Sequence, residues 1–133
     1  MATVLVIDDD KYIRKTLVKI LEKEGYKVME AADGQEAIQY LSENQVDLVL
    51  SDMDMPKMNG MDMMKKIRSL PQHRELPVLA LTSLESETDR MIGIEAGFAE
   101  YLMKFDRDSV LSAILRHLSL RHARIKEREE IHA

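Results

Sequence analysis

The sequence predicts an α/β protein with a doubly wound parallel sheet of five strands and helices on both faces. Three observations support this fold class. Short β-rich apolar runs recur along the chain, and a segment with apolar residues at helical spacing follows each of them. The connections between these segments are short. Strands and helices that alternate in this way form parallel sheets through right-handed crossovers.

The first strands and helices are readily delimited. Residues 3–7 (TVLVI) form an uninterrupted apolar run, which is typical of a strand covered on both faces. A helical pattern follows and ends at Gly25, a residue suited to the position just after a helix. Residues 26–31 mix charged and apolar side chains, as an edge strand does. Asp33, with an acid three residues later, has the pattern of a capping box that opens a helix through Leu41.

The same unit recurs in the second part of the chain. We expect strands at 46–51, 77–82 and 99–103, and helices at 60–70, 85–96 and from the cap Asp106 onward. Beyond residue 118 the apolar residues become too sparse for a coiled coil, which indicates an extended, solvated helix or a frayed linker. A partner-contacting helix is an alternative for this segment. We therefore expect residues 1–118 to form one domain and residues 119–133 a charged helical extension or linker.

Composition limits the classes of function. A chain of 133 residues with 45% hydrophobic and 32% charged residues is long enough and apolar enough for one folded domain. The absence of cysteine excludes disulfides, thiolate zinc sites and cysteine nucleophiles. A net charge of −5 argues against direct nucleic-acid binding. No apolar run has the length of a membrane span and no signal-peptide pattern opens the chain, so we expect a cytoplasmic location and no membrane partner.

Polar residues gather where the predicted strands end. Asp8 and Asp9 follow the first strand, Asp52 follows the third, Thr82 ends the fourth and Lys104 follows the fifth. The carboxyl ends of parallel strands open on one edge of the sheet, so these residues are expected to converge there.

The chemistry of this set indicates phosphoryl transfer. Three neighbouring carboxylates repel one another unless a cation joins them, and ligands that are all oxygen suit Mg²⁺. A lysine and a threonine hydroxyl opposite the metal suit the charged oxygens of a phosphoryl group. A carboxylate nucleophile of the aspartyl-phosphate type completes the set.

With these residues in place, the chain resembles the receiver domain of two-component response regulators over residues 1 to about 118. The matching segments are VLVIDDD (4–10), DLVLSDMDMPKMNG (47–60), LALTS (79–83) and AGFAEYLMK (96–104). Their order and intervals make the resemblance specific. It implies a chemotaxis-regulator-like, flavodoxin-like fold with strand order 2-1-3-4-5.

The resemblance also implies a role for each residue of the site. Asp52 matches the phosphoacceptor, and Asp8 and Asp9 match the acidic pair that holds Mg²⁺ together with Asp52. The main-chain carbonyl of Asp54 would supply a further metal ligand. Lys104 would pair with the phosphoryl oxygens.

A switch and its partners are implied in the same way. Thr82 would donate its hydroxyl to the phosphoryl group, and Tyr101 matches the aromatic residue that changes rotamer with it. The phosphoryl donor would be a sensor histidine kinase or a histidine phosphotransfer domain. The signal would reach a downstream protein, or an output domain missing from this chain, through about residues 85–118.

One position departs from the family pattern. Family members usually have a proline after the lysine, whereas Lys104 here is followed directly by Phe105. A cis peptide bond is costly without proline. We therefore expect a trans link and a shortened loop at this position.

Two other functions share parts of this inventory. A phosphohydrolase of the haloacid-dehalogenase type also uses an aspartyl phosphate, but its motifs run in the reverse order and it carries a cap domain that this length does not accommodate. A receiver-like interaction module that is never phosphorylated is the second alternative. The intact set of acids, threonine and lysine argues against it.

Methionines and histidines have structural explanations. The six methionines between residues 53 and 64 resemble a soft copper site, but hard carboxylates dominate the segment and methionine is an adaptable core residue. We expect Met64 to face the core. His73 is predicted to lie in a loop, and the other three histidines in the last helix or tail; none is needed for the chemistry.

Overall fold

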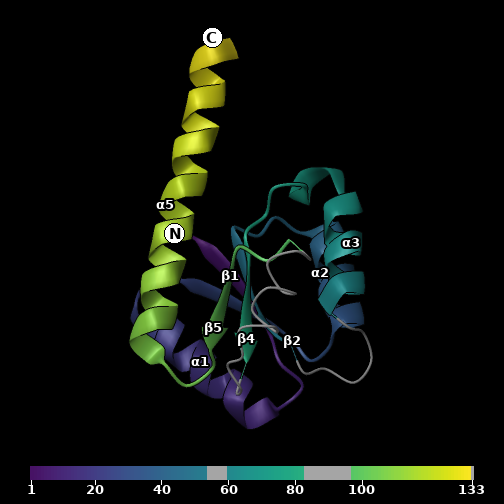
Figure 1. Ribbon diagram of the computed structural model, residues 1–133, viewed down its shortest axis with the longest axis vertical. Coiled ribbons are helices and arrows are strands. Elements are labelled where there is room, and N and C mark those ends of the chain that lie inside the picture. The colour runs from purple at the N-terminus through teal and green to yellow at the C-terminus, as the bar shows by residue number, and fades with distance from the viewer. Residues whose placement is uncertain (54–59, 83–96, 133) are drawn as a thin grey trace.

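A five-stranded parallel sheet with strand order β2-β1-β3-β4-β5 forms the centre of the molecule (Figure 1). The computed structural model describes residues 1–53, 60–82 and 97–132. The strands are β1 (Thr3–Ile7), β2 (Lys27–Ala31), β3 (Leu48–Asp52), β4 (Val78–Thr82) and β5 (Glu100–Met103). The described helices are α1 (Lys11–Lys23), α2 (Gly34–Glu43), α3 (Gly60–Ser69), the 3₁₀ helix η1 (Pro71–His73) and α5 (Arg107–His132). The predicted fold class and strand order are confirmed.

The helices cover both faces of the sheet and define two apolar cores. One face packs against α2 and α3, where Leu41 and Ile67 are fully buried. The other face packs against α1 and α5 through residues such as Leu21 and Ile114. Because β3 and β4 lie inside the sheet and every residue in them is buried, both begin with continuous apolar runs, and their polar residues come at the carboxyl ends. The more polar β2 is an edge strand, as its sequence predicts.

Side-chain caps fix where the helices begin. Asp10 Oδ1 accepts hydrogen bonds from the backbone N–H groups of residues 12 and 13 at 2.9 and 3.0 Å, which opens α1 directly after the first strand. Asp33 caps α2 and Asp106 caps α5 in the same manner. Gly25, just past α1, has a φ of 94°, a conformation that glycine adopts without strain. The caps at Asp33 and Asp106 and the glycine stop were expected from the sequence.

The predicted boundaries need small corrections. β3 begins at Leu48 instead of residue 46, and α2 continues to Glu43. The helix predicted at 85–96 lies outside the described residues. Among the described helices, none has the length and apolar character needed to cross a membrane.

The expectation that His73 lies in a loop is wrong. His73 ends η1 and is fully buried. Its Nε2 lies 3.0 Å from the carbonyl oxygen of Leu41 and 2.9 Å from that of Asn44, at the end of α2. The imidazole therefore satisfies carbonyls that the last turn of a helix leaves without an intrahelical donor.

α5 runs without interruption from Arg107 to His132, and its second half projects beyond the sheet (Figure 1). The segment after residue 118 is thus an extended helix. Its first half is fixed to the edge strand β5 by Glu100, whose carboxylate forms an ion pair with Arg116 and lies 2.9 Å from Nε2 of His117.

We predict that this contact makes stability depend on pH. Burial of Glu100 alone would raise its pKa, but the hydrogen bonds from Arg116 and His117 hold that pKa below the ordinary value of 4.5. A carboxyl group whose pKa is lowered by folding stabilises the folded state at pH values above its ordinary pKa. This contribution is lost as the pH falls through the lower pKa of the folded state. In urea titrations over a pH series, the stability gap between wild type and Glu100→Gln should therefore narrow as the pH falls below 4.5. The exposed Glu22→Gln change is the control, and a gap that stays constant would contradict the prediction.

Candidate functional site

The sheet brings the predicted site residues to one edge. Asp8 follows β1, while Asp52 and Thr82 are the last residues of β3 and β4. The register pairs Asp52 with Leu81 on β4 and Thr82 with Met103 on β5, so Lys104 comes one position beyond the paired residues. The expected convergence of residues from four strands is confirmed.

Lys104 connects two buried carboxylates. Its Nζ lies 2.8 Å from Oδ2 of Asp8 and 3.3 Å from Oδ2 of Asp52. The exposed fractions of these side chains are 8% for Lys104, 1% for Asp8 and 3% for Asp52. Burial alone would lower the pKa of Lys104, but the contacts with Asp8 and Asp52 raise it above its ordinary value. The ammonium group is therefore fixed in its charged form beside both carboxylates.

The backbone around Asp8 orients its carboxylate. Oδ1 accepts a hydrogen bond of 2.9 Å from the backbone N–H of Asp10, while Oδ2 faces Lys104. Arg14, on the first turns of α1, donates to the carbonyl oxygen of Asp8 at 2.7 Å and forms an ion pair with Glu30 on β2. Arg14 was not singled out from the sequence. Its only sequence clue is its position four residues after the helix cap.

Asp8, Asp9 and Asp52 form a cluster that could hold a metal ion. Each offers one carboxylate oxygen, and these three oxygens all lie within 4.8 Å of one another. Asp8 and Asp52 are buried, whereas Asp9 is exposed and borders the solvent. Three carboxylates and the ammonium group of Lys104 leave two negative charges, which a divalent cation would neutralise. An all-oxygen donor set of this charge fits Mg²⁺. The predicted further ligand, Asp54, lies outside the described residues.

Thr82 and Lys104 are coupled through the backbone. Thr82 is 3% exposed at the end of β4, and its carbonyl oxygen accepts a hydrogen bond of 2.7 Å from the backbone N–H of Lys104. The two residues that were expected to contact phosphoryl oxygens are thus held at adjacent strand ends. The Lys104–Phe105 peptide bond is trans, as expected.

Tyr101 lies on β5, half-buried against the core between the sheet and α3. It is paired in register with Ala80, two residues before Thr82 on the neighbouring strand. Tyr101 is therefore close in the sheet to the strand end that carries the threonine, without belonging to the acidic cluster.

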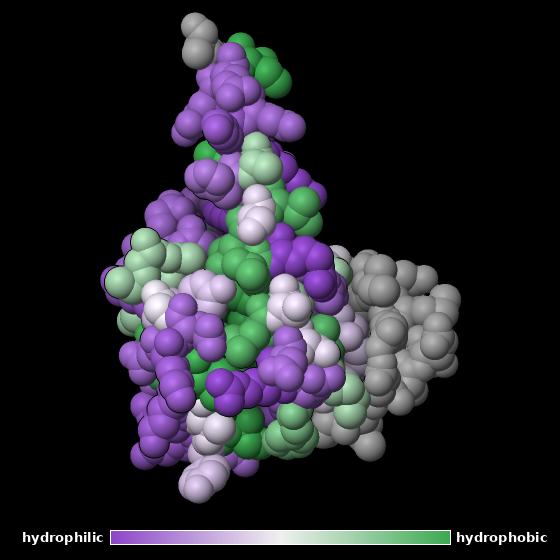
Figure 2. All heavy atoms as spheres, turned by 90° about the vertical axis from the view of Figure 1, so that its left-hand side faces the viewer, coloured by the Kyte–Doolittle hydropathy of each residue, from purple (hydrophilic) through white to green (hydrophobic). Residues whose placement is uncertain are grey.

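The side of the molecule that carries α5 presents apolar residues between hydrophilic ones (Figure 2). A groove of about 310 Å³ lies between α1 and α5, lined by residues that include Ile13, Ile20 and Leu111. Phe105, at the loop that leaves Lys104, lines the same groove and is 72% exposed. This groove begins beside the acidic cluster, because Lys104 itself contributes to its wall.

Comparison with known proteins settles the family. A family model described as the response regulator receiver domain matches residues 4–116. The chain belongs to the receiver domain family. The receiver domain accounts for both the parallel sheet and the acidic edge that the sequence predicts.

Curated relatives of this receiver domain include gene regulators. It is 38% identical over 130 residues to the transcriptional regulatory protein CpxR of Klebsiella pneumoniae subsp. pneumoniae (strain HS11286), covering 98% of this chain and 54% of the relative. It is 37% identical over 120 residues to the response regulator MprA of Mycobacterium sp. (strain KMS), covering 87% of this chain and 51% of the relative. The chain thus spans about half the length of the curated relatives it matches.

Solved structures agree with the receiver fold. The chemotaxis protein CheY4 of Vibrio cholerae superposes with a TM-score of 0.82 at 34% identity, over 87% of this chain and 98% of that one. The receiver domain of the sensor histidine kinase PA1611 from Pseudomonas aeruginosa PAO1, solved with a magnesium ion coordinated in its active site cleft, superposes with a TM-score of 0.81 at 27% identity. That match covers 89% of this chain and 98% of the other.

As a receiver domain, the chain is a phosphorylation-dependent switch of two-component signalling. Mg²⁺ binding and an aspartyl phosphate are general features of this family, whose members receive a phosphoryl group from histidine kinases. The comparisons lend no support to the phosphohydrolase alternative.

Proposed function

We propose that Asp52 is the phosphoryl acceptor of this receiver domain. The observation that carries the proposal is its position: a carboxylate at a buried strand end, 3.3 Å from the ammonium group of Lys104 and clustered with Asp8 and Asp9. Asp8 already has its own contacts with Lys104 and the backbone of Asp10. Asp9 is exposed, which suits a metal ligand at the rim better than a buried nucleophile.

The transfer follows the chemistry of a carboxylate nucleophile. An oxygen of Asp52 forms a new bond to phosphorus while the bond between phosphorus and the donor's histidine nitrogen breaks, and that nitrogen keeps the electron pair. Asp8, Asp9 and Asp52, with the main-chain carbonyl of Asp54, would hold Mg²⁺, which supplies charge neutralisation for the incoming phosphoryl oxygens. Lys104 adds a second positive charge to the same oxygens. Water later cleaves the acyl phosphate and resets the switch.

The response to phosphorylation is proposed to run through Thr82 and Tyr101. The Thr82 hydroxyl donates to the new phosphoryl oxygens, and Tyr101 changes its rotamer in the space between β5 and the core. This shifts an existing equilibrium of the surface formed by about residues 85–118. The buried position of Thr82 and the proximity of Tyr101 in the sheet register support this route.

The partners follow from the same proposal. A sensor histidine kinase or a histidine phosphotransfer domain would donate the phosphoryl group, and a downstream protein or an output domain would read the surface of residues 85–118. Within its described part, α5 supplies exposed apolar side chains such as Leu115 to this surface. The division into a receiver domain, 1–118, and a charged helical extension, 119–133, and the cytoplasmic location remain predictions.

Acetyl phosphate with Mg²⁺ tests the proposal. Intact-mass measurement should show one phosphoryl adduct on the wild-type protein, stable in acid and labile in base, and none on Asp52→Ala. The control is Asp108→Ala, which removes an exposed carboxylate from the first turn of α5 and should leave the adduct unchanged. Chelation of Mg²⁺ by EDTA should suppress the reaction.

Three outcomes would contradict the proposal. An adduct that persists in Asp52→Ala would move the acceptor to another residue. Steady turnover of p-nitrophenyl phosphate by the wild-type protein would indicate a phosphohydrolase. No adduct on the wild type under any Mg²⁺ concentration would favour an interaction module that is never phosphorylated.

A further inference from the structure

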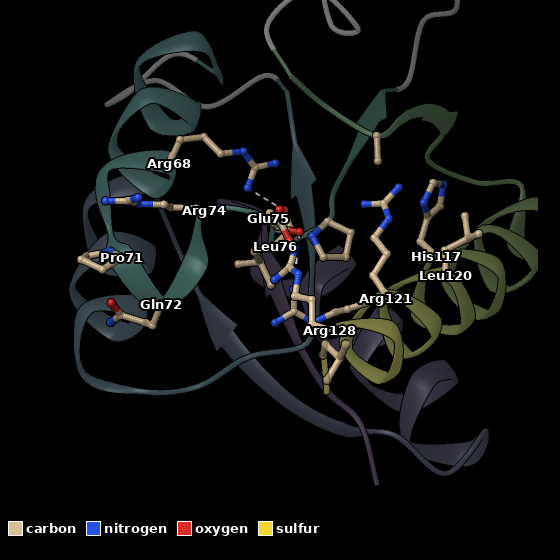
Figure 3. A pocket seen from close by; sticks show the side chains of 14 residues that line it. Arg68, Pro71, Gln72, Arg74, Glu75, Leu76, His117, Leu120, Arg121 and Arg128 are labelled. Carbon is tan, nitrogen blue, oxygen red and sulfur yellow. Dashed lines mark hydrogen bonds and ion pairs between the residues drawn. The ribbon is translucent and has the colours of Figure 1, made fainter. Parts of the chain in front are cut away.

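A second pocket, of about 630 Å³, lies at the opposite edge of the sheet from the acidic cluster. Its walls come from two parts of the chain that are distant in sequence. One runs from Arg68, near the end of α3, to Pro77 before β4, and the other is α5 from His117 to Arg128. Ala99, just before β5, completes the wall. Figure 3 shows Arg68 and Arg74 on the first side and Arg121 and Arg128 on the second, with Glu75 between them. This pocket is independent of the phosphorylation site.

Arginine dominates the charge of the pocket. Five arginines line it: Arg68, Arg74, Arg121, Arg124 and Arg128. Glu75 is the only carboxylate among the lining residues. Glu75 forms an ion pair with Arg128, and its charge also acts on Arg121 and Arg124. With five arginines and one glutamate, the lining residues carry four more positive charges than negative ones. A wall with this excess of positive charge attracts anions.

Arg68 and Arg121 contact backbone carbonyl oxygens and, among the described residues, no carboxylate within hydrogen-bond distance. Arg68 donates to the carbonyl oxygens of Leu76 and His73, at 2.7 and 3.2 Å, which are neutral acceptors. Arg121 reaches the carbonyl oxygen of Glu75 only at 3.5 Å, and its buried Nε has no hydrogen-bond partner. A buried donor without an acceptor is costly, so an acceptor supplied from outside would be stabilising. Burial lowers the pKa of Arg68, and the charge of Glu75 opposes this shift only in part.

We propose that this pocket binds a small anion that carries a diphosphate group, and that the bound anion fixes the projecting half of α5 against the body of the protein. A guanidinium group can donate two parallel hydrogen bonds to a pair of phosphate oxygens. Several guanidinium groups that converge therefore favour a multiply charged ligand over a single carboxylate. The volume is that of a small-molecule site and exceeds the need of one phosphate.

The apolar part of the wall suggests the rest of the ligand. Leu76, Leu120 and Ile125 line the pocket beside the arginines. A nucleoside diphosphate would place its phosphates on the guanidinium groups and its base on these side chains. The class of ligand is therefore a nucleoside diphosphate, with ADP as the probe and inorganic pyrophosphate as the probe for the phosphates alone.

Calorimetric titration with ADP and with pyrophosphate, in EDTA, tests the proposal without involving the Mg²⁺ site. The wild type should bind both, and ADP more tightly. Arg124→Gln should weaken binding of either probe by about tenfold, the loss expected for one charge-assisted hydrogen bond. Lys126→Gln removes the same charge from the same helix, at a residue outside the pocket wall, and should bind as the wild type does.

Removing a negative charge should have the opposite effect on affinity, and only inside the pocket. This distinguishes binding at the pocket from general electrostatic attraction to the protein. Glu75→Gln removes the carboxylate inside the pocket and should tighten binding, whereas Glu129→Gln, on the tail but outside the wall, should not. No binding of either probe, or equal effects of Arg124→Gln and Lys126→Gln, would overturn the proposal. Equal affinity for ADP and pyrophosphate would overturn the role of the apolar wall. Because EDTA excludes the phosphorylation reaction, these results are independent of the role of Asp52.

Discussion

Replacing Lys104 with methionine should destabilise the metal-free protein by about 3–5 kcal/mol, the usual cost of removing one partner from a buried ion pair. Asp8 and Asp52 are 1% and 3% exposed, so the variant would leave both carboxylates buried beside each other without the ammonium group between them. Chemical denaturation in EDTA measures the loss. Methionine keeps most of the side-chain volume, so the effect reports charge rather than a cavity.

Mg²⁺ should restore a large part of that stability, because a divalent cation supplies the missing positive charge to the same carboxylates. The control is Lys15→Met, which breaks an ion pair with Glu30 on the surface, where the lysine side chain is 52% exposed. That pair should contribute at most about 1 kcal/mol and show no dependence on Mg²⁺. A loss at Lys104 no larger than the loss at Lys15 would contradict the electrostatic account of the site.

Replacing Lys104 should affect the conformational response more strongly than phosphorylation itself. Lys104→Met is expected to keep some of the adduct with acetyl phosphate, since the nucleophile is intact, but to lose most of the conformational change. Amide NMR spectra of α5 before and after phosphorylation would show this. Identical shifts in wild type and variant would contradict it.

Replacing Leu79 with alanine should cost about 2–5 kcal/mol of unfolding free energy, through lost burial and the cavity that remains. Leu79 is the second residue of β4, is fully buried, and belongs to the core between the sheet and the helices α1 and α5. Urea unfolding should show a lower midpoint and an unchanged slope.

Leu115→Ala is the matched control for Leu79→Ala. Leu115 is 62% exposed on α5, and its truncation should change stability by no more than about 0.5 kcal/mol. Comparable losses at the two positions would mean that Leu115 is buried in solution, for example against another copy of the chain.

Much of the fold was predictable because a parallel sheet covered by helices requires a recognisable pattern of apolar residues in the sequence. β1, β3 and β4 are covered on both faces and therefore contain unbroken apolar runs, and Asp33 and Asp106 mark the starts of the helices that they cap. The acidic edge was predictable for a related reason. Residues at the carboxyl ends of parallel strands must share one edge, whatever their separation along the chain.

What escaped prediction depends on contacts between distant segments. His73 is buried where the end of α2 provides two carbonyl oxygens for its ring. These acceptors are distant in sequence, so the residues around His73 do not indicate its burial. The arginine-lined pocket combines residues near position 70 with others near position 125, so no local stretch of the sequence reveals it. The projecting half of α5 has few apolar residues, and periodicity alone could not distinguish helix from linker.

The unbroken course of α5 has a mechanical consequence. At 1.5 Å per residue, the part beyond Leu118 forms a rod about 20 Å long, continuous with the part that packs on the sheet. A rigid rod multiplies rotation at its base: tilting the packed half by about 10° would carry the far end through about 3–4 Å, given that length. A small rearrangement at the base of α5, which leaves the core intact, can therefore produce a movement of several ångströms at the far end of the helix.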